Sequence, residues 1–304
     1  MQSVPFGRLP CEVVTTRARE RIPAPALFVV GGLSMYVGAA LAVGLFDVLT
    51  PSTVAVLRLL GAAAVLLAWR RPGRAAWRGG RLVRASAFGL ATALMNLAFY
   101  EAIARLPLGT AVAIEFCGPV AVAAVASRRP RDVAAVLLAA TGVLLIADVR
   151  WSGSPSGVLW ALGAALMWAV YILLGKRVAS AGNGLDDMAV GFTVAAVALS
   201  PLLVLGGPGA LGALGDPVVL VLAVGVGVLS SVVPYVLDQL VLRRVGQARF
   251  AVLLALLPAT ATVVGLVALA QVPGMMEAVG IAAVVAAVAL RSRDGDDATS
   301  VAPS

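Results

Sequence analysis

Long apolar segments, separated by short breaks that contain charged residues, glycine or proline, set the pattern of this 304-residue sequence. Most segments are close to the roughly 20 apolar residues that a helix needs to cross a bilayer. The first is too long for the apolar core of a secretory signal peptide, so we interpret it as a retained helix. The pattern predicts an all-α integral membrane protein with ten transmembrane helices, at residues 25–46, 51–69, 83–104, 108–126, 132–148, 156–176, 187–206, 217–241, 247–270 and 275–290.

The composition agrees with this pattern and excludes several classes of protein. Hydrophobic residues make up 61% of the chain and charged residues only 12%, whereas soluble domains carry about 25% charged residues. The chain has no histidine, two widely separated cysteines, Cys11 and Cys117, and no close cluster of acidic residues apart from Asp294, Asp296 and Asp297 in the C-terminal tail. We therefore expect no metal site, no cofactor, no catalytic triad and no disulfide, and we do not expect an enzyme.

The distribution of basic residues predicts the orientation. All lysines and arginines except Arg58, Arg105 and Arg150 lie on one side of the predicted helices, in tails, breaks or adjoining helix ends. Because cytoplasmic loops are enriched in these residues, both termini are predicted to be cytoplasmic. The net charge of +8 then reflects topology and does not indicate nucleic acid. High alanine, glycine, valine and arginine usage suggests a GC-rich bacterial genome, so we expect the cytoplasmic (inner) membrane of a bacterium.

Two prolines mark an internal repeat. At an offset of 139 residues, Arg105 aligns with Arg244 and Pro119 aligns with Pro258. Five helices per half is an odd number, so a duplicated half inserts with the opposite orientation. Helix breaks at matched prolines of two inverted repeats indicate a transport site, while proline is also common in membrane helices in general. The predicted organisation is a disordered cytoplasmic tail, two five-helix repeats and a second cytoplasmic tail, at residues 1–22, 25–148, 156–290 and 291–304.

Two ionisable residues lie well inside predicted helices. Glu115 and Arg58 are each about seven residues, or roughly 10 Å, from the outer end of a helix. Such groups cost roughly 2.5 kcal/mol or more in a membrane and face the protein interior. We expect the two to neutralise each other, either within a substrate or proton pathway or as a buried clamp between helices. Pro119 cannot donate to the carbonyl of Glu115, which leaves that oxygen free for an ammonium group or water.

Polar and aromatic residues on three further segments are candidates for lining a cavity. They are Asn96, Tyr100, Trp168, Tyr171, Ser231, Pro234, Tyr235 and Asp238. Their i, i+3 and i, i+4 spacings allow neighbours to project from one helix face. Such groups suit a small zwitterion, but they also anchor helices at the interface or join helices to one another. We favour the cavity for Trp168 and Tyr171, and a helix-end role for Asp238, which lies near the predicted cytoplasmic boundary.

Four stretches carry a resemblance to a known family. They are MNLAFYEAIARLPLGTAVAIEFCGPVAVAAVASRRPRD at residues 95–132, VAVLRLLGA at 54–62, ALGAALMWAVYILLGKR at 161–177 and LSSVVPYVLD at 229–238. Together they resemble the threonine/homoserine exporter family of the EamA-type drug/metabolite transporter superfamily. The resemblance implies ten helices in two inverted repeats and proton-driven export of small amino acids. It places the family's helix 4 carboxylate on Glu115, its helix 2 arginine on Arg58 and its Pro-Tyr pair on Pro234 and Tyr235.

Two departures from the family concern coupling. Where the family usually has a Glu-Pro step in helix 9, this chain has Leu257 before Pro258. Where a Gly-Glu commonly follows that helix, this chain has Ala270 and Gln271. A carboxylate that could bind a proton or a substrate amine is therefore absent.

The expected function is export of a small zwitterionic substrate by alternating access, with protons as the coupling ion. Glu115 would bind the ammonium group or the proton, Arg58 would orient Glu115 or take the carboxylate, and Pro119 and Pro258 would provide helix breaks. We expect a monomer or homodimer in the lipid bilayer. The alternatives are an efflux pump for apolar or aromatic amines, and an uncoupled or non-transporting membrane homologue.

Overall fold

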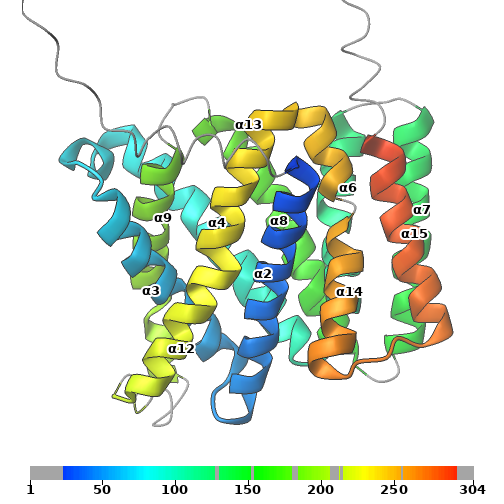
Figure 1. The fold of residues 1–304 in the computed structure, drawn as a ribbon, viewed down its shortest axis with the longest axis horizontal. Coiled ribbons are helices and arrows are strands. Elements are labelled where there is room, and N and C mark those ends of the chain that lie inside the picture. Colours follow the sequence, from blue (N-terminus) through cyan, green and yellow to red (C-terminus); the bar gives the residue numbers. More distant parts are fainter. Residues whose placement is uncertain are drawn as a thin grey trace, which may run out of the picture.

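The chain folds into a bundle of helices (Figure 1). The structure, a computed structural model, describes residues 23–126, 130–151, 154–179, 184–205, 212, 215–254 and 256–292, and these contain no strand. The helices are α2 (Ala24–Gly44), α3 (Pro51–Arg70), α4 (Gly79–Ile103), α5 (Leu108–Glu115), α6 (Cys117–Ala126), α7 (Pro130–Trp151), α8 (Pro155–Ala179), α9 (Gly184–Leu199), α10 (Pro201–Leu205), α12 (Pro217–Gly227), α13 (Val233–Leu254), α14 (Leu256–Leu269) and α15 (Met275–Ser292). Two 3-10 helices, η1 (Leu45–Asp47) and η2 (Arg74–Trp77), follow α2 and α3, and a π-helical segment, η3 (Val228–Val232), joins α12 to α13.

Several of these helices can cross a membrane. Six stretches are long and apolar enough, namely Ala24–Asp47, Pro51–Arg70, Gly79–Ile103, Pro155–Leu174, Gly184–Leu205 and Pro217–Asp238. Shorter apolar helical stretches cover Leu108–Val122, Val133–Leu145, Leu256–Leu269 and Met275–Ala287. The predicted all-helical class is confirmed, whereas ten membrane crossings and the inverted repeat remain predictions. The predicted tails at 1–22 and 291–304 lie outside the described residues, apart from the last two residues of α15.

Local sequence explains where the helices begin and end. Pro51 and Pro217 open α3 and α12, where a missing N–H costs no hydrogen bond. The preceding Thr50 and Asp216 accept hydrogen bonds from backbone N–H groups of the first turn. α3 ends where Arg71 adopts a left-handed conformation, with φ of 46°.

One predicted helix boundary is wrong. The sequence predicted a break after residue 241, but α13 continues through Arg244 and ends at Leu254. The charged residues here do not interrupt the helix, because arginine and glutamine are good helix formers and a single glycine is tolerated. The helix ends instead four residues before Pro258, which cannot donate a hydrogen bond to the carbonyl of Leu254. In Figure 1 α13 itself bends over the upper rim, and its last part runs down toward α14.

The two matched prolines occupy equivalent places in the structure. α5 ends at Glu115, and Pro119 is the third residue of the helix that follows. Pro258 is likewise the third residue of α14. α5 and α14 also pack directly against each other. The chain is therefore interrupted at two corresponding points that lie close together in the bundle.

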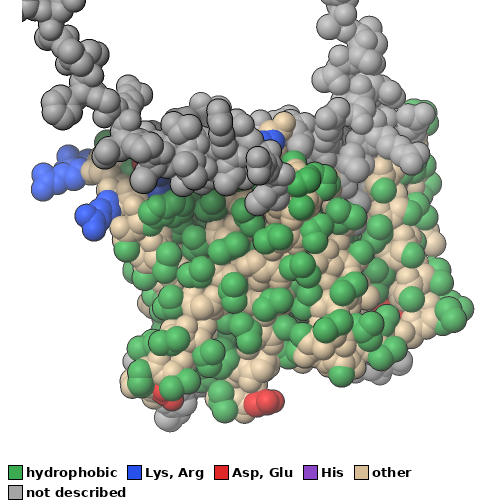
Figure 2. Space-filling view, in the orientation of Figure 1, with side chains coloured by type: hydrophobic (Ala, Val, Ile, Leu, Met, Phe, Trp, Pro, Cys, Tyr) green, Lys and Arg blue, Asp and Glu red, His purple; other side chains and the backbone are tan. Residues whose placement is uncertain are grey.

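Close packing and an apolar outer surface agree with a membrane environment. A Cβ on Gly89 would collide with the backbone of Gly191 where α4 meets α9. Such contacts between small residues are typical of helix packing in membranes. Figure 2 shows a lateral surface covered by hydrophobic side chains, with basic side chains at the upper rim and acidic ones at the lower rim. Within the bundle, α4 packs on α8 and α9, α7 on α15, and α2 on α13 and α14.

Two ion pairs hold the upper rim together. Arg70 Nε lies 3.0 Å from Asp186 Oδ1, and Arg81 Nε lies 2.6 Å from Asp187 Oδ1. They connect the end of α3 and the start of α4 to the first turn of α9, where carboxylates also interact favourably with the helix dipole. At this rim, opposite charges therefore neutralise each other directly.

Candidate functional site

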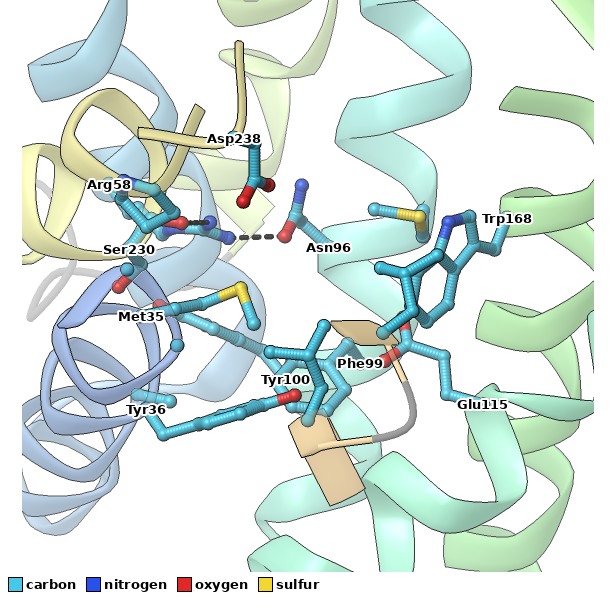
Figure 3. Close-up of a pocket in the computed structure, with 17 residues that line it drawn as sticks. Met35, Tyr36, Arg58, Asn96, Phe99, Tyr100, Glu115, Trp168, Ser230 and Asp238 are labelled. Carbon is cyan, nitrogen blue, oxygen red and sulfur yellow. Dashed lines mark hydrogen bonds between the residues drawn. The ribbon is translucent and has the colours of Figure 1, made fainter. Parts of the chain in front are cut away.

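A cavity of about 140 Å³ lies inside the bundle (Figure 3). α2, α3, α4 and α5 border it from the first half of the chain, and α8, η3, α13 and α14 border it from the second half. Its polar lining residues are Tyr36, Arg58, Asn96, Tyr100, Glu115, Ser230 and Asp238. Its apolar walls include Met35, Met95, Phe99, Trp168, Pro234 and Leu257. The cavity thus combines charged, amide and hydroxyl groups with aromatic surface.

Arg58 is held in this cavity by neutral groups. It is 6% exposed, and its Nη1 donates to Asn96 Oδ1 at 2.5 Å. Its Nη2 donates to the carbonyl oxygen of Ser230 and to Ser231 Oγ, at 2.9 Å each. Among the residues that the structure describes, its buried Nε has no hydrogen-bond partner. The guanidinium is therefore fixed in place, and within the described part of the chain no ion pair neutralises its positive charge.

The predicted mutual neutralisation of Arg58 and Glu115 is not found. Among the described residues, no carboxylate lies within 4.0 Å of the Arg58 guanidinium. Figure 3 shows Glu115 on the far side of the cavity from Arg58. Asn96 and the two serines of η3 hold the Arg58 guanidinium on its own side of the cavity, away from Glu115. The two opposite charges therefore face the same space without contacting each other.

Pro234 explains why η3 can hold Arg58. In a regular α-helix the carbonyl of Ser230 would accept from the residue four positions later, which is Pro234 and has no N–H. That carbonyl instead accepts from Arg58. The local widening into a π-helical turn is a feature that occurs frequently at functional sites. Pro234 therefore contributes to the site through the carbonyl that it leaves free.

Glycines allow the neighbouring helices to approach η3. A Cβ on Gly227 would lie 2.6 Å from the carbonyl oxygen of Arg58, so α12 and α3 meet backbone to backbone. Gly38 of α2 lies directly against Ser230. Ser34 Oγ donates to the carbonyl of Leu229 at 2.8 Å. These contacts fix η3 between α2 and α3, and with it the position of the guanidinium.

Two residues of α4 complete the surroundings of Arg58. Asn96 Nδ2 donates to the carbonyl of Thr92 at 2.7 Å, so its Oδ1 is the atom that faces the arginine. The ring of Tyr100 is 1% exposed, and its centroid lies 5.3 Å from Arg58 Cζ, within the range of a cation–π interaction. Both residues were predicted from sequence, and both line the cavity with Arg58.

The two carboxylates of the cavity lie on different helices. Glu115, 8% exposed, is the last residue of α5, at the break before α6. Asp238 lies on α13, and its carboxylate points into the cavity (Figure 3). The anchoring or helix-joining role that the sequence favoured for Asp238 did not anticipate its place in the cavity lining. Its expected position near one end of a membrane-spanning stretch agrees with the stretch Pro217–Asp238.

The remaining candidates divide between the cavity and the helix packing. Trp168 lines the cavity, and its ring packs edge-on against Phe116 with centroids 4.7 Å apart. Tyr171 does not line it, because its ring packs on Phe88 of α4 at 4.8 Å. Tyr235 packs against the apolar cluster between α3, α4 and α9. Pro119 and Pro258 also lie outside the lining.

Sequence reasoning missed two polar residues of the lining. Tyr36 of α2 is 3% exposed, and a tyrosine in the middle of an apolar segment is a signal that could have identified it. Ser230 was passed over in favour of its neighbour, Ser231. Within the described ranges, no group of three or more His, Cys, Asp or Glu side chains could hold a metal ion.

Comparison with known proteins identifies the family. The sequence profile of the EamA-like transporter family matches residues 155–293. The chain is 36% identical over 257 residues to threonine/homoserine exporter RhtA of Salmonella typhimurium strain LT2, covering 84% of this chain and 86% of that protein. It is 34% identical over 264 residues to threonine/homoserine exporter RhtA of Escherichia coli strain K12, covering 86% and 88%.

A solved crystal structure shares the fold. It aligns with a TM-score of 0.60 at 21% identity, over 90% of this chain and 98% of that chain. The family profile and the sequence relatives confirm the resemblance predicted from sequence. This multi-pass membrane protein belongs to the threonine/homoserine exporter family of EamA-like transporters.

Proposed function

We propose that the protein exports small amino acids of the threonine and homoserine type, or closely related metabolites, across the inner membrane. The names of its relatives support this class of substrate. The observation that carries the proposal is the separation of charges in the cavity. Arg58 and Glu115 face the same space from opposite sides without an ion pair between them. A zwitterion supplies the missing partner for each.

Arg58 binds the substrate carboxylate in this proposal. A guanidinium has five N–H donors, and three hydrogen bonds to neutral groups occupy one hydrogen of Nη1 and both of Nη2, which leaves the second Nη1 hydrogen for a substrate carboxylate while Nε is buried. A carboxylate would add charge-assisted hydrogen bonds, which are about twice as strong as neutral ones. Because the guanidinium is already fixed, binding costs little further ordering of this side chain.

Glu115 binds the ammonium group. Its carboxylate lines the cavity, and its carbonyl cannot accept from Pro119 four residues later. A carboxylate and a free carbonyl at one helix break are both suitable acceptors for an ammonium group. Broken helices at the centre of the bilayer are where secondary transporters commonly bind substrate and coupling ions.

The size of the cavity favours a small substrate. Its volume of about 140 Å³ is below the roughly 300–1,000 Å³ of pockets that hold drug-sized ligands. The aromatic and methionine side chains in its wall favour a second candidate, an apolar or aromatic amine. Such an amine has no carboxylate, so it would leave Arg58 without a partner. We therefore rank the amino acid first.

Transport proceeds by alternating access between two inverted five-helix repeats. The ten apolar helical stretches support this arrangement. So do the interruptions before Pro119 and Pro258, which stand at corresponding points of the two halves and beside the cavity. With both termini cytoplasmic, the basic upper rim in Figure 2 faces the cytoplasm.

Protons drive the export through Glu115. One carboxylate cannot hold a proton and pair with an ammonium group at the same time, so a proton that arrives from outside displaces the substrate. Leu257, which lines the cavity, offers no second carboxylate at the position where the family usually has one. The coupling therefore depends on residues outside helix α14.

The test is efflux of labelled threonine and homoserine from proteoliposomes that contain the purified protein, with and without an imposed pH gradient. We expect efflux that the gradient accelerates. Glu115→Gln keeps the shape of the side chain but binds no proton, so we expect it to remove this acceleration. Efflux without any gradient response would indicate a facilitator. Absence of efflux for both amino acids, with efflux of aromatic amines, would favour the second candidate.

A further inference from the structure

Asp238 gives the cavity a second carboxylate, for which the proposed function has no use. It lines the cavity from α13 and points into it (Figure 3). Among the described residues it has no hydrogen bond and no ion pair. A carboxylate in the interior of a membrane protein is costly unless a cation approaches it. Its orientation into the cavity indicates that the cation belongs to a ligand bound in the cavity.

Contacts between α2 and α13 define the depth of Asp238. A Cβ added to Gly31 of α2 would lie 3.6 Å from Leu237 Cβ, and Gly38 faces Ser230, so the two helices run antiparallel. Asp238 therefore lies level with the early part of α2, about seven residues or roughly 10 Å beyond Ser231. Ser231 is a partner of Arg58. The second carboxylate thus lies between Arg58 and the end of the bundle where α2 begins.

The two carboxylates are on different sides of the Arg58 anchor. In Figure 3, Asp238 and Glu115 lie on opposite sides of the hydrogen bond between Arg58 and Asn96. The hydrogen bonds from Asn96, Ser230 and Ser231 keep the guanidinium in place between them. A small zwitterion whose carboxylate stays on the guanidinium can therefore direct its ammonium group to either side.

We propose that Asp238 is the first binding station for the substrate ammonium group, on the side of the cavity where α2 begins. The substrate carboxylate stays on Arg58, and the ammonium group moves from Asp238 to Glu115 as export proceeds. The ammonium group then has an anionic partner at each stage and is never left unpaired in the low-dielectric interior. This inference rests on the proposed export function, in which that side is cytoplasmic.

The experiment compares the half-saturating threonine concentration at the two faces of the membrane. Inside-out vesicles present the cytoplasmic face to added threonine, and right-side-out vesicles present the other face. Asp238→Asn removes the charge but keeps the shape. We expect it to raise the half-saturating threonine concentration about tenfold at the cytoplasmic face, a loss typical of one charged hydrogen bond, and less than about twofold at the other face. Asp238→Glu is expected to restore most of the affinity.

Asp47→Asn is the matched control. It makes the same chemical change on an exposed carboxylate of η1, outside the cavity. We expect wild-type half-saturation at both faces. Threonine binding to detergent-purified protein, followed by fluorescence of Trp168 and the other tryptophans, reports affinity even where a variant inserts poorly into vesicles. Asp238→Asn should weaken this binding, and Asp238→Glu should not.

Three outcomes would overturn the inference. Unchanged half-saturation at the cytoplasmic face would remove Asp238 from substrate binding. An equal rise at both faces would contradict a station on one side. Loss of the pH-gradient response with unchanged affinity would make Asp238 a proton site instead. If the wild-type protein moves neither threonine nor homoserine, the proposed function itself fails, and that result is distinct from all three.

Discussion

Opposite charges contact each other at the rim of this protein, whereas in its cavity they are kept apart. At the rim, Arg70 and Arg81 each contact an aspartate of α9 directly. In the cavity, the contacts of Arg58 with described residues are all to neutral groups, although Glu115 and Asp238 border the same space. Desolvated charges without a partner cost much more than paired ones. Keeping them apart in the interior therefore indicates that a ligand of mixed charge completes the site.

Removal of the cavity cation should have the largest effect. In Arg58→Gln the side chain retains hydrogen-bonding groups but loses the positive charge that would bind a carboxylate. We expect threonine transport to fall about a hundredfold or more, equivalent to roughly 2.7 kcal/mol. The measurement is initial efflux from proteoliposomes. Arg70→Gln at the rim is the matched control, and an equal fall in both variants would contradict the distinction between rim and cavity.

Creation of a direct ion pair inside the cavity, like those at the rim, should have the next largest effect. Asn96→Asp puts a carboxylate at the atom that now accepts from Arg58 at 2.5 Å. The new ion pair would occupy the guanidinium that the substrate needs, so we expect at least about a tenfold loss of threonine affinity. Threonine binding to the purified variant measures the loss of affinity, and its thermal unfolding measures the effect of the new ion pair on stability.

The expected signature of this variant is weak binding in a protein that unfolds no earlier than wild type. Asn96→Ala serves as its control, because it removes the acceptor without adding a charge. Retention of full affinity by Asn96→Asp would mean that Arg58 is not the carboxylate anchor.

Disturbance of the backbone contact behind Arg58 should have a smaller effect, on stability. A Cβ at position 227 would lie 2.6 Å from the carbonyl oxygen of Arg58. We expect Gly227→Ala to destabilise the protein by about 1–3 kcal/mol, as overpacking generally does. Thermal unfolding in detergent measures this. Gly225→Ala, whose Cβ would meet nothing within 4 Å, is the control, and equal melting temperatures would show that α12 can shift without cost.

Loss of a rim pair should have the smallest effect. Asp186→Asn breaks the contact with Arg70, whose side chain is 38% exposed. Partly exposed ion pairs contribute about 0–1 kcal/mol, so we expect a change of less than about 1 kcal/mol in unfolding free energy and unchanged transport. A large loss of transport here would mean that the rim takes part in the cycle.

The sequence allowed the helices and much of the cavity to be predicted, because these depend on local pattern. Apolar length predicts a membrane helix, and an ionisable residue such as Glu115 or Arg58 inside one predicts an interior site. The structure brings both to one cavity with Asn96, Tyr100 and Trp168. Their roles in transport remain predictions that the experiments above address.

Contacts between distant helices were beyond sequence reasoning. The partners of Arg58 come from α4 and η3, more than 30 residues away in one case and more than 170 in the other. Tyr171 and Tyr235 carry suitable chemistry, but a small rotation about the helix axis decides whether they face the cavity or a neighbouring helix. Asp238 was not expected in the cavity, because its position near the end of a membrane-spanning stretch favoured a role outside it.

The central claim is that the cavity recognises both charges of its substrate, and analogues with one charge removed test it most directly. Inhibition of labelled threonine efflux by threonine, threoninol and N-acetylthreonine is measured for the wild-type protein and for Arg58→Gln. We predict that the wild type strongly prefers threonine, and that Arg58→Gln no longer distinguishes threonine from threoninol while it still rejects N-acetylthreonine. An unchanged preference for threonine over threoninol in Arg58→Gln would contradict it.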